Sequence, residues 1–199
     1  IGGKTNMNFN KHLFFEGFVA YGFKDHRLKF RTCAMYSFAE KRYNQWEFPK
    51  NLLSIKYEQN TKIHGQSLLM GEADRFSLSF NRGKTDKMSF DRLVRAEYEY
   101  ETTSQLSLKT GVQYLQEQPL AGLKFISFDK SKVYNKISSP SFDIELRYAK
   151  GEKFFQQQQY RLTINTTAPI ITLNYTYGTN LFGNDYEYHK IKASIEKRF

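Results

Sequence analysis

Three glutamates, Glu97, Glu99 and Glu101, alternate with other residues along one stretch of the chain. In a β-strand this spacing places the three side chains on one face, roughly 7 Å apart, where carboxylates could hold a cation or form an acid–base pair. Lys109 follows in the next stretch, and rows of opposite charges that pair across strands are common in sheets. We therefore interpret these glutamates as ion-paired residues and predict no catalytic residue among them.

The other reactive side chains are scattered. Cys33 is the only cysteine, so an intrachain disulfide is impossible, and no histidine lies close to it in sequence. The chain also lacks a Gly-x-Ser-x-Gly nucleophile motif. The histidines lie apart, without the spacing of a zinc site: His12, His26, His64 and His189. The sequence therefore predicts no metal site, no cofactor and no catalytic nucleophile.

Aromatic residues gather in one irregular stretch, residues 39–50. Tyr43, Trp46 and Phe48 precede Pro49 and are candidates for binding a sugar, a lipid headgroup or a protein partner. The alternative is that these rings brace their own loop, and this is the interpretation we favour.

The elements that position these residues are strands. Residues 89–118 alternate between apolar and polar side chains, which is the period of a β-strand. If residues 102–104 form a three-residue loop, Tyr100 pairs with Leu106, and Glu97 faces Lys109. A two-residue loop would put every apolar side chain beside a polar one, so the pattern selects the longer loop. Each strand then has about a dozen residues, longer than the roughly five or six of a typical soluble strand.

The same alternation recurs along the chain and predicts about ten strands. A first hairpin turns at residues 24–26, and further strands lie around residues 53–57, 76–80, 142–148, 162–164, 171–177 and 191–195. The short turns at residues 102–104 and 166–168 fall at opposite ends of such a sheet, so we expect one strand to be miscounted. Residues 123–128 could supply it, or could form a small hairpin within a loop.

Alternating strands with one charged face occur in soluble sandwiches and in membrane barrels. Strands that cover the roughly 9–11 residues needed to cross a bilayer, and loops of unequal length, favour the barrel. Tyrosines near strand ends favour it too: Tyr21, Tyr100, Tyr148 and Tyr177. The mean hydropathy of −0.65 and the lack of any long apolar run exclude a transmembrane helix, whereas an alternating strand leaves no hydropathy peak. We predict an all-β, antiparallel transmembrane β-barrel, with residues 1–199 as a single segment of it.

This prediction assigns each face of the strands to one environment. Apolar side chains are expected to face lipid: Tyr98, Tyr100, Leu106, Leu108, Phe142, Ile144 and Leu146. Polar side chains are expected to face the lumen: Arg95, Glu97, Glu99, Lys109, Asp143, Glu145 and Arg147.

The formal net charge of +10 raises the question of nucleic-acid binding, because basic surfaces bind phosphates. Arg27, Lys29 and Arg31 share one strand face, but acidic residues occupy the corresponding positions of other strands. This mixed polar face is unlike a phosphate-binding stripe, and we predict no nucleic-acid partner.

Four stretches resemble one protein family in their order along the chain. They are NKHLFFEGFVAYGFKDHRLKF, AEKRYNQWEFPKN, IELRYAKGEKFFQQQQYRLTINTTAPIITLNYTYG and GNDYEYHKIKASIEKRF. They are similar to a Bacteroidota outer-membrane family in which a carboxypeptidase-regulatory-like domain precedes a large β-barrel, itself distantly similar to surface-antigen assembly barrels. The resemblance implies a piece of a longer polypeptide, from which an N-terminal periplasmic domain and the final barrel strands are absent.

The resemblance implies a location in the bacterial outer membrane. We expect a non-enzymatic barrel that acts in envelope biogenesis, protein assembly, secretion or transport, with the lipid bilayer and other envelope proteins as partners. Two alternatives remain, a soluble β-sandwich binding module and, more remotely, an outer-membrane barrel hydrolase. The last strand, around residues 189–199, alternates to its end, so we expect its outer edge and the edge near residues 13–23 to be open.

Overall fold

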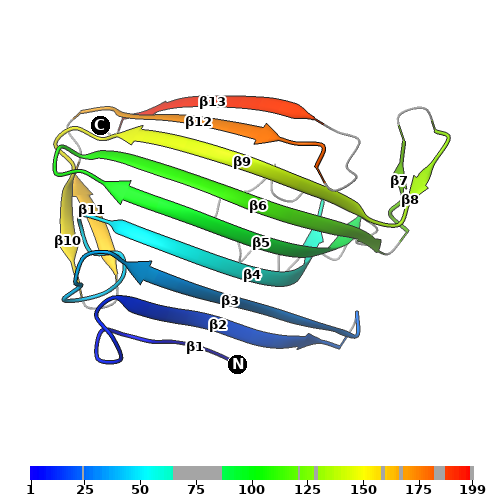
Figure 1. The fold of residues 1–199 in the computed structure, drawn as a ribbon, viewed down its shortest axis with the longest axis horizontal. Helices are drawn as coiled ribbons and strands as arrows, with labels where there is room; N and C mark the ends of the chain where they lie inside the picture. Colours follow the sequence, from blue (N-terminus) through cyan, green and yellow to red (C-terminus); the bar gives the residue numbers. More distant parts are fainter. Residues whose placement is uncertain are drawn as a thin grey trace.

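The computed structural model describes residues 1–23, 25–64, 87–120, 122–127, 130–157, 160–165, 168–181 and 187–197. These residues form strands and no helix that could cross a membrane. Figure 1 shows the strands: β1 (Gly2–Lys4), β2 (Leu13–Gly22), β3 (Arg27–Ser37), β4 (Asn51–Ile63), β5 (Met88–Glu101), β6 (Leu106–Leu120), β7 (Phe125–Ile126), β8 (Val133–Tyr134), β9 (Ile137–Tyr148), β10 (Lys153–Gln156), β11 (Arg161–Asn165), β12 (Ile170–Gly178) and β13 (Tyr188–Glu196).

Nine of these strands form one curved antiparallel sheet in chain order, β1-β2-β3-β4-β5-β6-β9-β12-β13. Among the described residues, β1 pairs only with β2 and β13 only with β12, so the sheet is open at both edges. The predicted all-β antiparallel fold is confirmed, but the strands of the described residues do not form a closed barrel. The described residues place nine strands in this sheet, where the sequence predicted about ten strands; of those ten, the strand around residues 162–164 lies in a separate hairpin.

Of the two hairpins that the described residues form outside this sheet, the first, β10–β11, contains one of the strands that the sequence predicted for the sheet. Leu162 and Ile164 belong to β11, which pairs with β10 and not with the large sheet. The connection from β9 to β12 therefore starts and ends at the same end of the sheet as the β5–β6 turn. The expectation that one strand was miscounted is confirmed, because β11 has the alternation of a sheet strand without being one; residues 166 and 167 of the second predicted turn lie outside the described residues. The second hairpin, β7–β8, lies within the β6–β9 connection, as one alternative for residues 123–128 predicted. The strand expected around residues 76–80 lies outside the described residues.

The β5–β6 hairpin has the predicted loop length in a different place. Tyr100 pairs with Leu108 instead of Leu106, and Lys109 lies opposite Glu99 instead of Glu97. The loop consists of residues 103–105, because the Thr102 N–H donates to the Leu106 carbonyl and Gln105 adopts a φ of 64°. Such a left-handed third residue is typical of three-residue hairpin loops. The different loop position shifts the pairing of β5 with β6 by two residues, and a shift of two leaves every side chain on its predicted face.

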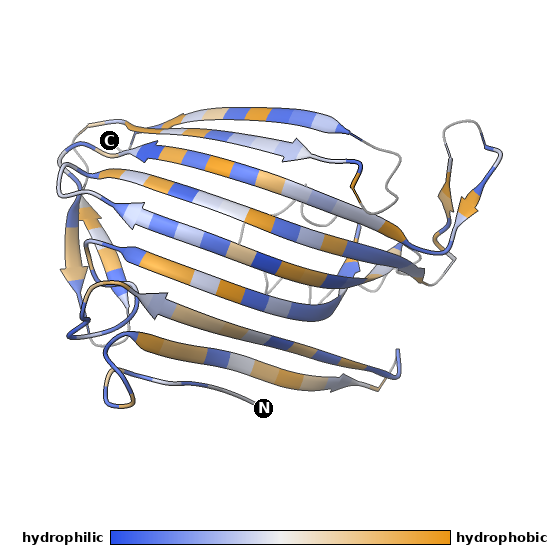
Figure 2. Cartoon of the chain, in the orientation of Figure 1, coloured by the Kyte–Doolittle hydropathy of each residue, from blue (hydrophilic) through white to orange (hydrophobic). Residues whose placement is uncertain are grey.

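The two faces of the sheet differ in chemistry, and Figure 2 shows the alternation along each strand. We call one side the apolar face; it includes Val19, Ile55, Val112, Leu146 and Ile191, all exposed. We call the other side the charged face; it includes Arg31, Lys56, Arg95, Glu97, Lys109, Asp143 and Arg147. A small core of Phe14, Cys33, Met35 and Leu52 lies on the charged face.

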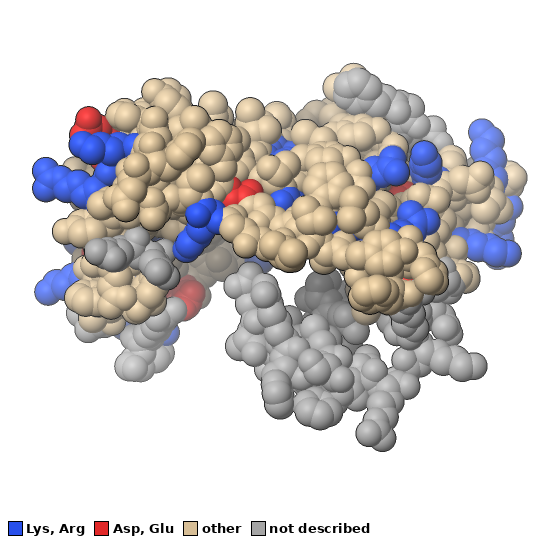
Figure 3. Space-filling view, turned by 90° about the horizontal axis from the view of Figure 1, so that it is seen from below, with Lys and Arg blue, Asp and Glu red and all other residues tan. Residues whose placement is uncertain are grey.

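The sheet is covered differently at its two ends. The end at which residues 38–50, the β5–β6 turn and the β10–β11 hairpin gather is called the capped end (Figure 1). In a view from the β1 side, Lys and Arg lie mostly toward the two ends, and the middle is largely uncharged (Figure 3).

Candidate functional site

Arg95 is the centre of an ion-paired network on the charged face. Its Nη2 lies 2.7 Å from Glu97 Oε2 and 2.8 Å from Asp143 Oδ2, and its Nη1 donates to Gln113 Oε1 at 2.9 Å. Asp143 is two strands away, on β9, with Gly111 of β6 between it and Glu97. A Cβ at Gly111 would lie 3.1 Å from Arg95 Nη2, so the absence of a side chain lets the guanidinium cross β6.

The seven polar residues predicted to face a lumen all lie on the charged face, and the structure brings some of them together. Arg95 contacts Glu97 and Asp143, while Lys109 Nζ lies 4.0 Å from Glu97 Oε1. Their function as lumen residues stays a prediction. The others pair outside the predicted set: Glu99 with Lys50, Arg147 with Glu152, and Glu145 with Asn174.

The capped end holds a second network that the sequence did not reveal. Arg161 of β11 donates from both Nη atoms to the buried Glu101 carboxylate, each at 2.8 Å. The Lys50 N–H also donates to Glu101 Oε2 at 3.0 Å. The Arg161 guanidinium lies 4.3 Å from the centre of the Phe154 ring. Arg147 and Glu152 make a similar two-bond pair, at 2.8 and 2.6 Å, so two ion pairs fix the β10–β11 hairpin to the charged face.

The three loop aromatics differ in their surroundings. Phe48 packs on Phe154 of the hairpin, with ring centroids 5.2 Å apart. Trp46 and Tyr43 are both exposed at the surface. Trp46 lies 5.3 Å from Lys50 Nζ and lines one cavity, and Tyr43 lines another, beside residues 4–8.

A buried lysine closes the loop that carries these rings. Lys41 Nζ donates to the carbonyls of Glu47 at 2.8 Å and Pro49 at 2.9 Å. Burial lowers the pKa of Lys41, although the negative charges of Glu47 and Glu101 oppose this effect. The loop is therefore held by an internal cation and by its contact with the hairpin.

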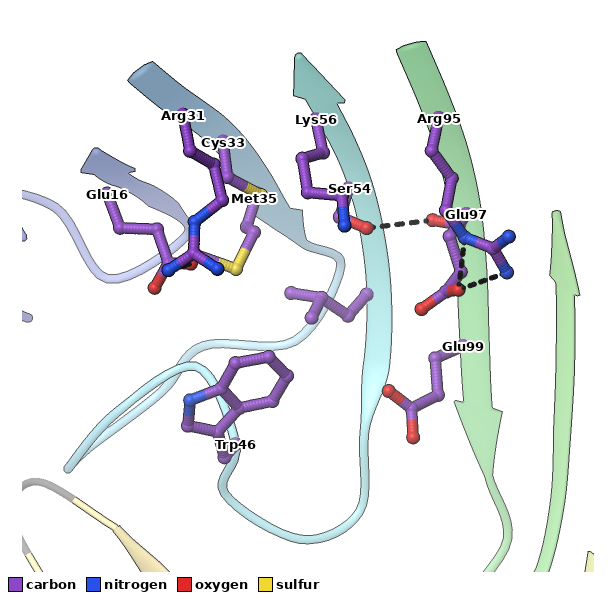
Figure 4. Close-up of a pocket in the computed structure, with 11 residues that line it drawn as sticks. Glu16, Arg31, Cys33, Met35, Trp46, Ser54, Lys56, Arg95, Glu97 and Glu99 are labelled. Atoms are coloured by element: carbon purple, nitrogen blue, oxygen red, sulfur yellow. Dashed lines mark hydrogen bonds and ion pairs between the residues drawn. The ribbon is translucent and has the colours of Figure 1, made fainter. Parts of the chain in front are cut away.

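Two cavities lie on the charged face. The first, which we call the Trp46 cavity, has a volume of about 200 Å³ and is drawn in Figure 4. Its floor is apolar, with Cys33, Met35 and Leu52, and its walls carry Glu16, Arg31, Lys56, Arg95, Glu97 and Glu99. The second, of about 150 Å³, lies beneath the hairpin and is lined by the residues of the Arg161 and Arg147 pairs.

A serine and a histidine meet at the opposite end of the sheet. His64, which seemed isolated in sequence, places Nε2 2.8 Å from Ser89 Oγ. Ser89 donates to Asp91 Oδ1 at 2.5 Å and is fully buried. In a hydrolase the serine donates to the histidine, and the acid orients that histidine. Here the serine hydroxyl lies between histidine and acid, which is a different order. In the part of the chain that the structure describes, no three side chains of the metal-binding types lie close enough together to hold a metal ion.

The fold and these networks define a class: an all-β protein whose long antiparallel strands expose an apolar face and carry ion pairs on the other. The chain belongs to a family of unknown function, DUF5686, and matches the C-terminal domain of that family over residues 2–199. No curated protein and no solved structure matches the chain.

Proposed function

We propose that this chain forms a membrane-spanning wall of a β-barrel in the bacterial outer membrane. The apolar face contacts lipid, and the charged face lines an aqueous lumen. The barrel is not an enzyme; it acts in envelope biogenesis, protein assembly, secretion or transport, together with other envelope proteins.

The observation that carries the proposal is the exposure of the apolar face. Ile55 is 55% exposed, Val112 54% and Ile191 73%, and they lie on three different strands. Soluble proteins rarely leave so wide an apolar surface open to water. The strands are long enough for a bilayer, since β5 has 14 residues and β6 has 15, against roughly 9–11 for a tilted crossing strand.

The aromatic residues support the same orientation. Tyr100 and Tyr148 lie at the capped ends of their strands, and Tyr21 and Tyr177 at the opposite ends. Membrane barrels carry such aromatic side chains where the strands meet the two interfaces.

The soluble sandwich is less well supported. In a sandwich a second sheet packs on the apolar face. In the described part of the chain no strand covers that face, and β10–β11 is fixed to the charged face through Arg161 and Glu101. A hydrolytic step is also poorly supported, because Ser89 donates to Asp91 and has no exposed surface.

Spin labels on neighbouring residues test the orientation. In a Cys33→Ser background, labels are placed at Leu108 and at Lys109 of the full-length protein in liposomes. We expect oxygen, which partitions into lipid, to relax the label at Leu108, and a water-soluble nickel chelate to relax the label at Lys109. Equal responses at both positions would contradict the assignment of the two faces.

Fractionation tests the wider proposal. The native full-length protein should require detergent for extraction, and its recovery in the aqueous fraction would favour the sandwich. Affinity isolation of the extracted complex then identifies the envelope proteins with which the barrel acts.

A further inference from the structure

The Trp46 cavity has one tightly paired wall and one loosely paired wall. On the tight wall, Arg95 makes hydrogen bonds of 2.7–2.9 Å to three acceptors, and Glu99 lies 2.8 Å from Lys50 Nζ. These charges are already neutralised by the protein, so a ligand would gain little from them.

The loose wall is formed by Glu16, Arg31 and Lys56. The contact between Arg31 Nη2 and Glu16 Oε1 is 3.9 Å long, and Lys56 Nζ lies 3.7 Å from Glu58 Oε2. Arg31 Nε is buried and has no hydrogen-bond partner within the described part of the chain. Buried donors in native proteins nearly always have a partner, so an unpaired one calls for a physical explanation.

The edge of the Arg31 guanidinium that carries Nε and Nη2 faces Glu16 without a hydrogen bond to it. Nη2 lies 3.9 Å from Glu16 Oε1, beyond hydrogen-bond distance, and Nε has no acceptor among the described residues. Figure 4 shows the guanidinium beside Glu16, near the end of the Met35 side chain. A planar carboxylate can accept two parallel hydrogen bonds from such an edge, and Lys56 supplies a second positive charge nearby.

The rest of the cavity suits an apolar body. Met35 and Leu52 are almost fully buried in its floor, and the Trp46 ring forms a side wall. The volume of about 200 Å³ is below the roughly 300–1,000 Å³ of pockets for drug-sized ligands. A ligand of one ring or a short chain is the appropriate size.

We propose that the Trp46 cavity binds a small amphipathic carboxylate. The carboxylate lies on the Nε edge of Arg31 with Lys56 beside it, and the ring or chain packs between Trp46 and the Met35–Leu52 floor. The cavity lies on the charged face, so binding there does not depend on contact between the apolar face and lipid.

The test uses Trp46 itself, which is the only tryptophan of the chain. The full chain, in a neutral detergent, is titrated with 4-bromobenzoate, whose bromine quenches an adjacent indole. The neutral 4-bromobenzyl alcohol and the cationic 4-bromobenzylamine have nearly the same shape. We expect saturable quenching by the carboxylate, and at least about tenfold weaker binding of the other two, because a charge-assisted hydrogen bond is lost.

Variants separate binding to Arg31 from general adsorption. Arg31→Gln should weaken 4-bromobenzoate binding about tenfold, and Arg31→Lys should restore only part of it, because lysine keeps the charge without the two-bond edge. Glu16→Gln should strengthen binding, since it removes the competing carboxylate. Arg27 lies on the same strand and the same face as Arg31 but outside the cavity, so the Arg27→Gln variant should bind 4-bromobenzoate normally. An unchanged Trp46 emission maximum without ligand shows that each variant retains the fold around the cavity.

Four results would overturn the proposal. Equal quenching by the alcohol would show simple apolar partitioning, and preference for the amine would show that the carboxylates dominate the cavity. Quenching that does not saturate, or that is unaffected by both Arg31 substitutions, would show that no site exists.

Discussion

The Arg161–Glu101 pair should hold the β10–β11 hairpin in place, and its removal has a calculable effect. Glu101 accepts two charge-assisted hydrogen bonds from Arg161 and one from the Lys50 N–H, and both side chains of the pair are about one-tenth exposed. Removing one partner of a buried ion pair typically costs about 3–5 kcal/mol, because the other charge is left uncompensated. Slight exposure reduces this value, so we expect Glu101→Gln to cost about 2–3 kcal/mol.

A double-mutant cycle isolates the interaction. Glu101→Gln, Arg161→Gln and the double variant are compared by urea unfolding and by hydrogen exchange of the β10–β11 amides. The double variant should be less destabilised than the sum of the two single variants by about 1–3 kcal/mol, because it leaves no unpaired charge. The matched control is Lys11–Glu40, a pair whose side chains are 62% and 66% exposed, where the coupling should be below about 1 kcal/mol. Additive effects at Glu101 and Arg161 would refute the inference that this pair fixes the hairpin.

Two further perturbations follow from the structure. Gly111→Ala places a Cβ 3.1 Å from Arg95 Nη2 and 3.2 Å from the Ala96 carbonyl oxygen, so it should displace the guanidinium. We expect the free energy of unfolding in urea to fall by about 1–3 kcal/mol. Gly3→Ala is the control, because its Cβ would have no atom within 4 Å, and equal effects of the two substitutions would contradict this prediction. The hydrogen bond from Lys29 Nζ lowers the pKa of Asp25 in the folded protein, and Thr61 adds to this effect, although partial burial opposes it. The ionised carboxylate therefore stabilises the fold fully above the ordinary aspartate pKa of about 3.9. This stability is lost as the pH falls through the lower pKa of the folded state. Hydrogen exchange of the His26 backbone amide, relative to its intrinsic rate, should therefore become faster only in strongly acidic solution. Asp25→Asn should abolish this acid-dependent change. If the change persisted in the variant, another group would be responsible for it.

The sequence predicted the strands and their faces well, because both depend on a local period of two. It did not predict the β5–β6 register, since pairing Tyr100 with Leu106 or with Leu108 places the same side chains on the same face. The left-handed backbone at Gln105, which selects the second pairing, had no glycine or asparagine to indicate it.

The networks were harder to predict because they depend on long-range contacts. Glu101 and Arg161 are 60 residues apart, and His64 and Ser89 are 25 apart, with no spacing that indicates either contact. The alternation of β11 also resembles that of the sheet strands, so the sequence could not show that this hairpin folds onto the charged face.

Lys50 connects the hairpin to the Trp46 cavity. Its backbone N–H binds Glu101, its Nζ lies 2.8 Å from Glu99, and the same Nζ lies 5.3 Å from the Trp46 ring. Glu99 in turn lines both cavities of the charged face. Lys50 Nζ is paired with Glu99 of β5 and not with the hairpin, so release of Arg161 from Glu101 should leave the Lys50–Glu99 contact in place. Substitution of Lys50, in contrast, removes a positive charge from Glu99 and from Glu101 together, because Lys50 Nζ also lies 3.8 Å from Glu101 Oε1.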